Sequence, residues 1–187
     1  LHATLLSFCL LLAACGSVPP APSDRFYRLQ PVSVSSASKA LPGAVAVQAF
    51  RADSLYAERP IIHAEESSLR QLRQYHYHLW LYPPAQMVQG HFVSSLGGAL
   101  DLSGGSNAHY VMDGRILGFE RVLSGKNSKA VVALELRLLA GGKTLLNRTY
   151  QAEQAAADDS LDAFAVAMEQ ALAKIYTEFL ADLARTR

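Results

Sequence analysis

The chain has 187 residues, with 17 Lys and Arg against 16 Asp and Glu and a formal net charge of +1 at pH 7. Nucleic-acid binding relies on a strongly positive face or stripe, and the sequence has neither, so we expect no nucleic-acid partner.

The first segment, residues 3–14, is apolar except for Thr4 and Ser7. About a dozen apolar residues suit the h-region of a secretory signal and are too few to span a bilayer as a helix. We therefore predict that residues 1–14 form a signal peptide.

The end of this segment, Leu12-Ala13-Ala14-Cys15, resembles the bacterial lipobox. The resemblance implies cleavage before Cys15, a diacylglycerol group on its thiol and a further acyl chain on its amino group. Gly16 and Ser17 stand where an aspartate would favour retention in the inner membrane, which implies export to the outer membrane. The departures from the pattern are the missing initiator Met and the lack of Lys or Arg before the h-region. The alternative is a chance cysteine behind an ordinary signal.

Residues 15–24 continue as a small, proline-rich stretch, which predicts a short extended tether behind the lipidated cysteine. With Cys9 removed and Cys15 acylated, no disulfide would remain, so the hydrophobic core alone would stabilise the fold. We expect residues 25–187 to form a single domain.

The first half of this domain is predicted to hold strands at 25–30 and 44–50. The segment 61–82 is rich in β-formers at both ends, which favours two strands around a turn near Glu66 to Ser68. Pro83 and Pro84 then open a helix, which Gly97-Gly98 end.

The second half predicts three strands in series, at 110–123, 129–139 and 143–152, joined by turns at 125–127 and 141–142. A long helix follows, with Ser160 as its N-cap and one apolar stripe. The expected fold is a two-layer α+β domain, in which a mainly antiparallel sheet with a meander carries two helices on one face.

Motifs of catalysis and cofactor binding are missing from the sequence. Gly141-Gly142-Lys143-Thr144 resembles the end of a phosphate loop, but Arg137 stands where that motif needs its first glycine, and the segment joins two strands. No G-x-S-x-G pentapeptide occurs. Asp158-Asp159 suits the start of a helix, where acids complement the backbone dipole. We predict that the protein is not an enzyme and that it binds no cofactor.

The one arrangement that could hold a metal is a set of histidines. His76 and His78 lie two residues apart on a predicted strand, and His63 lies on its expected neighbour. Three imidazoles could hold zinc with an open position for hydrolysis. No H-E-x-x-H spacing accompanies them, so a metal site is the lesser alternative and we predict none.

An aromatic cluster, Tyr75, Tyr77, Trp80 and Tyr82, precedes the proline pair. Strand alternation places Tyr77 on one face with Leu79 and Leu81, and His76, His78, Trp80 and Tyr82 on the other. Rings with a polar edge suit a protein or lipid interface. The alternative is that Trp80 packs under the helix that Pro83 opens.

The order of these features resembles the PqiC-like auxiliary lipoproteins of ABC-type transporters, which work with MCE-domain proteins. The matching stretches are the lipobox, 26–29 (FYRL), 55–62 (LYAERPII), 77–84 (YHLWLYPP) and the capped last helix. Two features depart from the family pattern: no tyrosine or arginine pair comes just after the strand at 61–64, and no acidic residue stands at Leu81-Tyr82.

The resemblance implies a periplasmic lipoprotein on the outer membrane that helps an MCE-domain protein and an ABC permease and ATPase move phospholipid or other hydrophobic molecules. It also implies that ATP hydrolysis belongs to other subunits, and it leaves contact with phospholipid and homo-oligomerisation open. The candidate partner interface comprises Tyr56, Arg59, Tyr77, Trp80, Tyr82 and Pro83. The alternative function is that of a structural or assembly lipoprotein of the cell envelope.

Overall fold

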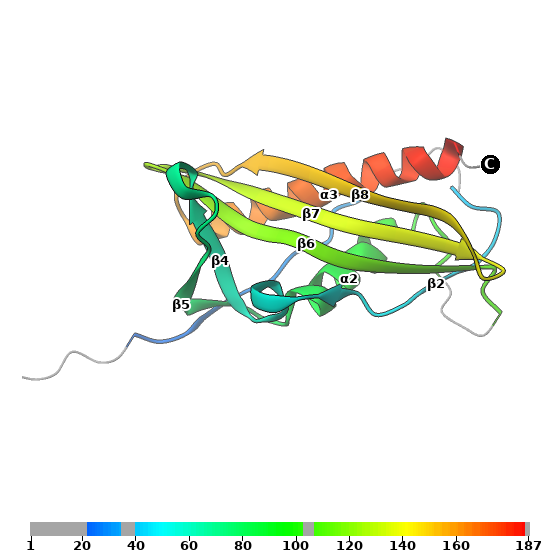
Figure 1. Ribbon diagram of the computed structural model, residues 1–187, viewed down its shortest axis with the longest axis horizontal. Coiled ribbons are helices and arrows are strands. Elements are labelled where there is room, and N and C mark those ends of the chain that lie inside the picture. Colours follow the sequence, from blue (N-terminus) through cyan, green and yellow to red (C-terminus); the bar gives the residue numbers. More distant parts are fainter. Residues whose placement is uncertain (1–21, 35–39, 103–106, 186–187) are drawn as a thin grey trace, which may run out of the picture.

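The computed structural model describes residues 22–34, 40–102 and 107–185. The predicted signal peptide, Cys15, Gly16, Ser17 and most of the tether lie outside the described residues. Within the described residues, eight strands form one sheet, and two α-helices pack against it (Figure 1). The helices are α2 (Pro84–Leu96) and α3 (Leu161–Arg185), and two short 3-10 helices are η1 (Ser54–Ala57) and η2 (Glu66–Ser68). The strands are β1 (Arg25–Tyr27), β2 (Val45–Val47), β3 (Arg51–Ala52), β4 (Pro60–Glu65), β5 (Arg73–Trp80), β6 (Tyr110–Ser124), β7 (Asn127–Ala140) and β8 (Lys143–Ala155).

The antiparallel meander β6-β7-β8 confirms the prediction for the second half of the chain. Its tight turns contain Gly125, Gly141 and Gly142, which all adopt a positive φ that glycine accepts without strain. Alternate residues of β7, from Val132 to Leu138, are fully buried. The period of two seen in the sequence therefore sets which face of the sheet meets the helices.

The full sheet runs in the order β1-β5-β4-β6-β7-β8, with β2 and β3 also paired to β6. It is mixed, because β4 lies parallel to β6 and β1 lies parallel to β5. The α+β fold is as predicted, and the turn between β4 and β5 falls at Glu66–Ser68, also as predicted.

Two predicted strands are shorter than expected. The strand predicted at 25–30 ends at Tyr27, because the following backbone turns to the helices: the Gln30 amide donates to Glu169 Oε1 (2.6 Å) and the Val32 amide to Ser95 Oγ (3.2 Å). The strand predicted at 44–50 ends at Val47, beyond which Phe50 turns into the core. Side-chain acceptors on the helices thus replace the sheet ladder after Tyr27, and the Phe50 amide likewise donates to Gln89 Oε1 of α2 at 3.4 Å.

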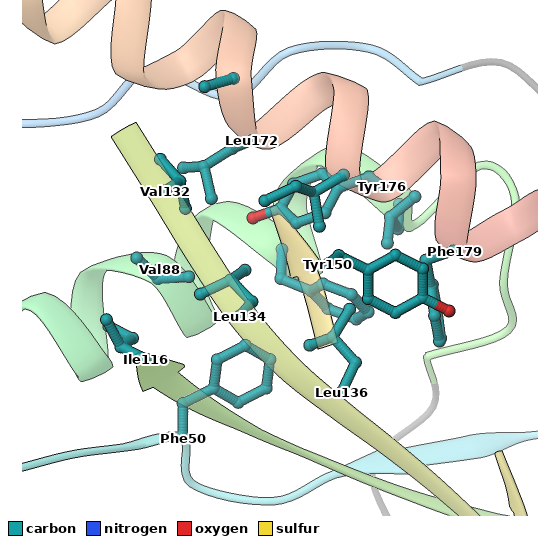
Figure 2. Close-up of a cluster of buried hydrophobic side chains, with 14 of the residues drawn as sticks. Phe50, Val88, Ile116, Val132, Leu134, Leu136, Tyr150, Leu172, Tyr176 and Phe179 are labelled. Atoms are coloured by element: carbon teal, nitrogen blue, oxygen red, sulfur yellow. The ribbon is translucent and has the colours of Figure 1, made fainter. Parts of the chain in front are cut away.

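Both helices cover the same face of the sheet (Figure 1). Ser160 caps α3 as predicted, since its Oγ accepts the Ala163 amide at 3.0 Å. Figure 2 shows Val132, Leu134 and Leu136 of β7 beside residues of both helices. The buried core falls entirely between Ala40 and Leu183. In the described part of the chain, no helix combines the length and the apolar character that crossing a membrane requires.

Candidate partner-binding surface

The strand β5 carries a break in its register that decides which aromatic residues face outward. Pro60 pairs with Leu79 but Ile62 pairs with Gln74, so two steps along β4 match five along β5. Such an irregularity inserts unpaired residues and interrupts the alternation of faces.

The break leaves His76 and Tyr77 exposed between the part-buried Tyr75 and His78, whose rings contact each other. Trp80 is buried and Tyr82 is exposed. The prediction that His76, His78, Trp80 and Tyr82 share one face is therefore wrong, because it assumed an unbroken alternation.

Trp80 belongs to the core. Its side chain is 1% exposed, and its ring lies 5.3 Å from that of Phe119 and 5.9 Å from that of Phe164. The predicted interface role of Trp80 is wrong, and the alternative of a packed tryptophan holds. Its described ring partners are on β6 and α3, whereas that alternative placed Trp80 under the helix opened by Pro83.

Two other candidates, Tyr56 and Arg59, make internal contacts. The Tyr56 hydroxyl donates to a carboxylate oxygen of Glu120, and burial together with this carboxylate raises the pKa of Tyr56. Arg59 Nε donates to the Trp80 carbonyl at 3.0 Å, and its guanidinium carbon lies 5.1 Å from the centre of the Phe26 ring. Arg59 therefore supports the β1-β5 edge on which the exposed aromatics stand, whereas Tyr56 ties η1 to β6 inside the sheet.

The three histidines do not converge. The His63 ring lies 4.3 Å from that of Tyr75, His78 Nδ1 lies 3.0 Å from the Tyr27 hydroxyl, and His76 is exposed. Burial lowers the pKa of both His63 and His78. Across 22–34, 40–102 and 107–185, no three His, Cys, Asp or Glu side chains are placed so that they could hold a metal ion. The geometry thus gives the zinc alternative no ligand set.

A groove of about 740 Å³ lies between the segment after β1, the end of β5 and the outer side of α2. Tyr82 is 50% exposed and Val93 38% exposed at this groove. Pro83, at the N-cap of α2, is exposed beside them. The apolar lining of the groove consists of Leu29, Pro31, Leu81, Tyr82, Met87 and Val93.

The contribution of α2 to this groove was not predicted from the sequence. Met87, Val88, Phe92 and Leu96 form the buried stripe of α2, whereas Val93 lies outside that stripe and is exposed. An apolar residue off the buried stripe of a helix is the signal that could have indicated a second contact surface.

One wall of the groove is fixed by His91. Its Nε2 lies 3.0 Å from the Gln30 carbonyl oxygen, which can only accept, so Nε2 carries the proton and Nδ1 accepts from the Tyr176 hydroxyl at 3.1 Å. Burial lowers the pKa of His91 to about 4, so the ring is neutral at neutral pH. His91 thus ties the chain after β1 to α2 and α3, and the groove is preformed.

A second exposed surface lies beside the groove on β1 and β5. We call Phe26, Tyr77 and Leu79 the Phe26 patch: Phe26 pairs with Leu79, and the side chains of Phe26 and Tyr77 are 51% and 43% exposed. Leu81, which is 38% exposed and lines the groove, follows Leu79 in the chain. Groove and patch together place apolar and aromatic side chains at one sheet edge, an arrangement suited to binding.

Comparison with known proteins decides the family. The family model for the ABC-type transport auxiliary lipoprotein component matches residues 27–179. The chain belongs to this family. This matched range contains the described groove and nearly all of the sheet and helices.

Two solved structures resemble this ABC-type transport auxiliary lipoprotein in fold. A Xanthomonas campestris protein of the DUF330 family is 20% identical, with a TM-score of 0.73 over 87% of this chain and 96% of that chain. A second, uncharacterized protein is 19% identical, with a TM-score of 0.65 over 88% of this chain and 98% of that chain. A search of curated proteins finds no match.

Proposed function

We propose that this protein is a periplasmic lipoprotein, anchored to the outer membrane through Cys15, that serves as a non-catalytic accessory subunit of an ABC-type transporter with an MCE-domain protein. The transported molecules are phospholipids or other hydrophobic compounds, and the permease and ATPase are separate subunits. Residues 25–187 form the working domain. The single observation that carries this proposal is the family match over residues 27–179.

The N-terminal sequence supports the anchor. A short apolar segment ends in Leu12-Ala13-Ala14-Cys15, and Gly16 and Ser17 follow it. A lipid group with several acyl chains holds a protein at a membrane far more firmly than a single chain does.

The groove supports a binding role for the domain. A volume of about 740 Å³ lies in the range of sites that accept a small ligand or several side chains of a partner. The bond from His91 to the Gln30 carbonyl holds one wall in place, so little ordering would be needed on binding. We assign the docking of the MCE-domain protein to this groove, in which Tyr82, Leu81 and Val93 are exposed apolar contacts.

Co-purification from solubilised membranes of the native host tests this assignment. The tagged full chain should recover an MCE-domain protein, identified by mass spectrometry. The double substitution Tyr82→Ser, Val93→Ser should reduce the recovered amount at least about tenfold, because interface contacts near the centre of a site dominate affinity. Leu145→Ser, Val166→Ser is the matched control, since these side chains are 44% and 50% exposed elsewhere.

Recovery of no MCE-domain protein by the wild-type chain would contradict the proposed partner. A deletion strain with a fragile envelope but an unchanged distribution of phospholipid between the membranes would instead support the structural or assembly role. Equal recovery with both double variants would exclude the groove as the docking site.

A further inference from the structure

The Phe26 patch lies outside the groove to which we assign the MCE-domain protein, so it is free for another partner. Phe26 is on β1, an edge strand of the sheet, and its ring is about half exposed while Arg59 lies against it. Tyr77 is exposed on the neighbouring strand. Exposed aromatic rings gathered at a sheet edge indicate a contact surface.

The short chain between Cys15 and β1 limits how far the Phe26 patch can lie from a membrane that holds Cys15. Six residues lie between Cys15 and Pro22, the first described residue, and a fully extended chain covers at most about 25 Å over these seven steps. The 15 residues of β6 span about 50 Å. Figure 1 places the start of β1 and the end of β5 at one end of the molecule and the C-terminal end at the other. A lipid group on Cys15 would therefore keep the end with the Phe26 patch close to the bilayer.

The charges around the patch favour an anionic surface. Arg25 and Arg28 are exposed on either side of Phe26 in the chain, and the guanidinium of Arg59 lies over its ring. Among the described residues, none of these three arginines forms an ion pair. The acids nearest in sequence are Asp24 and Glu58. Aromatic rings with adjacent arginines suit the headgroup region of a membrane, where rings sit between apolar and wet layers and guanidinium groups bind phosphates.

We propose that the Phe26 patch is a second membrane contact, which binds anionic phospholipid headgroups of the leaflet that holds the acylated Cys15. This inference rests on the lipid anchor of the proposed function. Leu81 lines the groove and lies two residues after Leu79 of the patch, so groove and patch are neighbours. The membrane contact therefore orients the domain with the mouth of the groove beside the membrane surface.

Vesicle flotation tests the patch without the lipid group. The chain from residue 15 onward with Cys15→Ser contains the whole described core, which lies between Ala40 and Leu183, and is expected to fold. It should float with vesicles of phosphatidylethanolamine and phosphatidylglycerol at low salt, and less with phosphatidylcholine vesicles or at high salt. Phe26→Ser, Tyr77→Ser should lower the bound fraction at least about fivefold, because both rings are removed from the headgroup layer.

The control Leu145→Ser, Val166→Ser should bind the vesicles as the parent chain does. Absent binding, equal binding by the patch variant, or an equal loss in the control would overturn the inference. Native mass measurement of a dimer that the patch variant abolishes would also overturn it, since a second copy would then occupy the patch. Acylation of Cys15 is measured separately, so a missing anchor and a patch that does not bind membranes give different results.

Discussion

The half of the molecule built from β6, β7, β8 and α3 differs from the edge built from β1, β5 and α2 in where it places aromatic side chains. The rings of Phe119, Phe164 and Phe179 in the first half are buried. In the first half, polar groups are paired inside: the Tyr150 hydroxyl donates to Asp182 Oδ2 at 2.8 Å, and Arg148 Nη1 donates to the same oxygen at 2.7 Å. At the edge, Phe26, Tyr77 and Tyr82 are 43% to 51% exposed. The first half therefore stabilises the domain, while the edge is available for binding.

Trp80 and Tyr82 mark the boundary between these two regions. They lie two residues apart, yet Trp80 is 1% exposed and Tyr82 is 50% exposed. Similar residue types in one short stretch thus serve stability and contact separately, and substitutions can distinguish the two roles.

The largest effect is expected for Trp80→Ala. Removing this ring leaves a cavity between Phe119 and Phe164, and a buried aromatic truncated to alanine costs roughly 3 to 5 kcal/mol of the free energy of unfolding. Urea denaturation followed by circular dichroism measures this loss. A cost below about 1 kcal/mol would show that Trp80 does not pack as described.

The next effect is a pH dependence that comes from His91. Its pKa is about 4 in the fold and near 6.5 in an unfolded chain, so the unfolded chain binds the proton first as the pH falls. The stability that the neutral ring contributes is complete above about pH 6.5 and is lost as the pH falls toward about 4, by up to about 3 kcal/mol.

Denaturation curves of the wild type and His91→Gln between pH 7.5 and 4 check this. The difference between the two pH dependences of unfolding free energy isolates the contribution of His91, because the acidic residues titrate in both proteins. Identical pH slopes in the two proteins would contradict the assignment of His91 as a neutral, buried group.

Gly114→Ala is expected to destabilise the β6 side of the core by about 1 to 3 kcal/mol, because an added Cβ would lie 2.7 Å from the Phe50 ring. Gly90→Ala on α2 is the matched control, since nothing lies within 4 Å of the added carbon. Thermal unfolding measures both, and equal melting temperatures for the two variants would argue against the packing of Phe50 on β6.

The smallest effect on stability is expected at the edge. Tyr82→Ser, Val93→Ser should change the free energy of unfolding by no more than about 0.5 kcal/mol, because substitutions at exposed sites seldom cost more. Chemical denaturation of this variant beside Trp80→Ala gives the comparison directly. A loss near that of Trp80→Ala would mean that the groove residues belong to the core.

The meander, the capped last helix and the β4-β5 turn could be predicted because local patterns encode them. Val132 to Leu138 alternate, Gly141-Gly142 close a hairpin, and Ser160 precedes an apolar stripe. The sheet order and the parallel pairing of β4 with β6 could not be predicted from the sequence, because they depend on contacts between distant segments.

The candidate site was only partly predictable. Tyr77, Tyr82 and Pro83 are exposed as an interface requires, but the register break in β5 interrupts the expected alternation of faces before Trp80. The groove needs Leu29 and Val93, which are far apart in sequence and meet only in the fold.

The measurement that tests the account most directly is the intact mass of the processed protein purified from membranes of its native host. We predict a chain that begins at Cys15 and carries the mass of a diacylglycerol group and an amide-linked acyl chain. A chain with an unmodified Cys15 thiol, or one cleaved at another position, would contradict a lipoprotein held at the membrane.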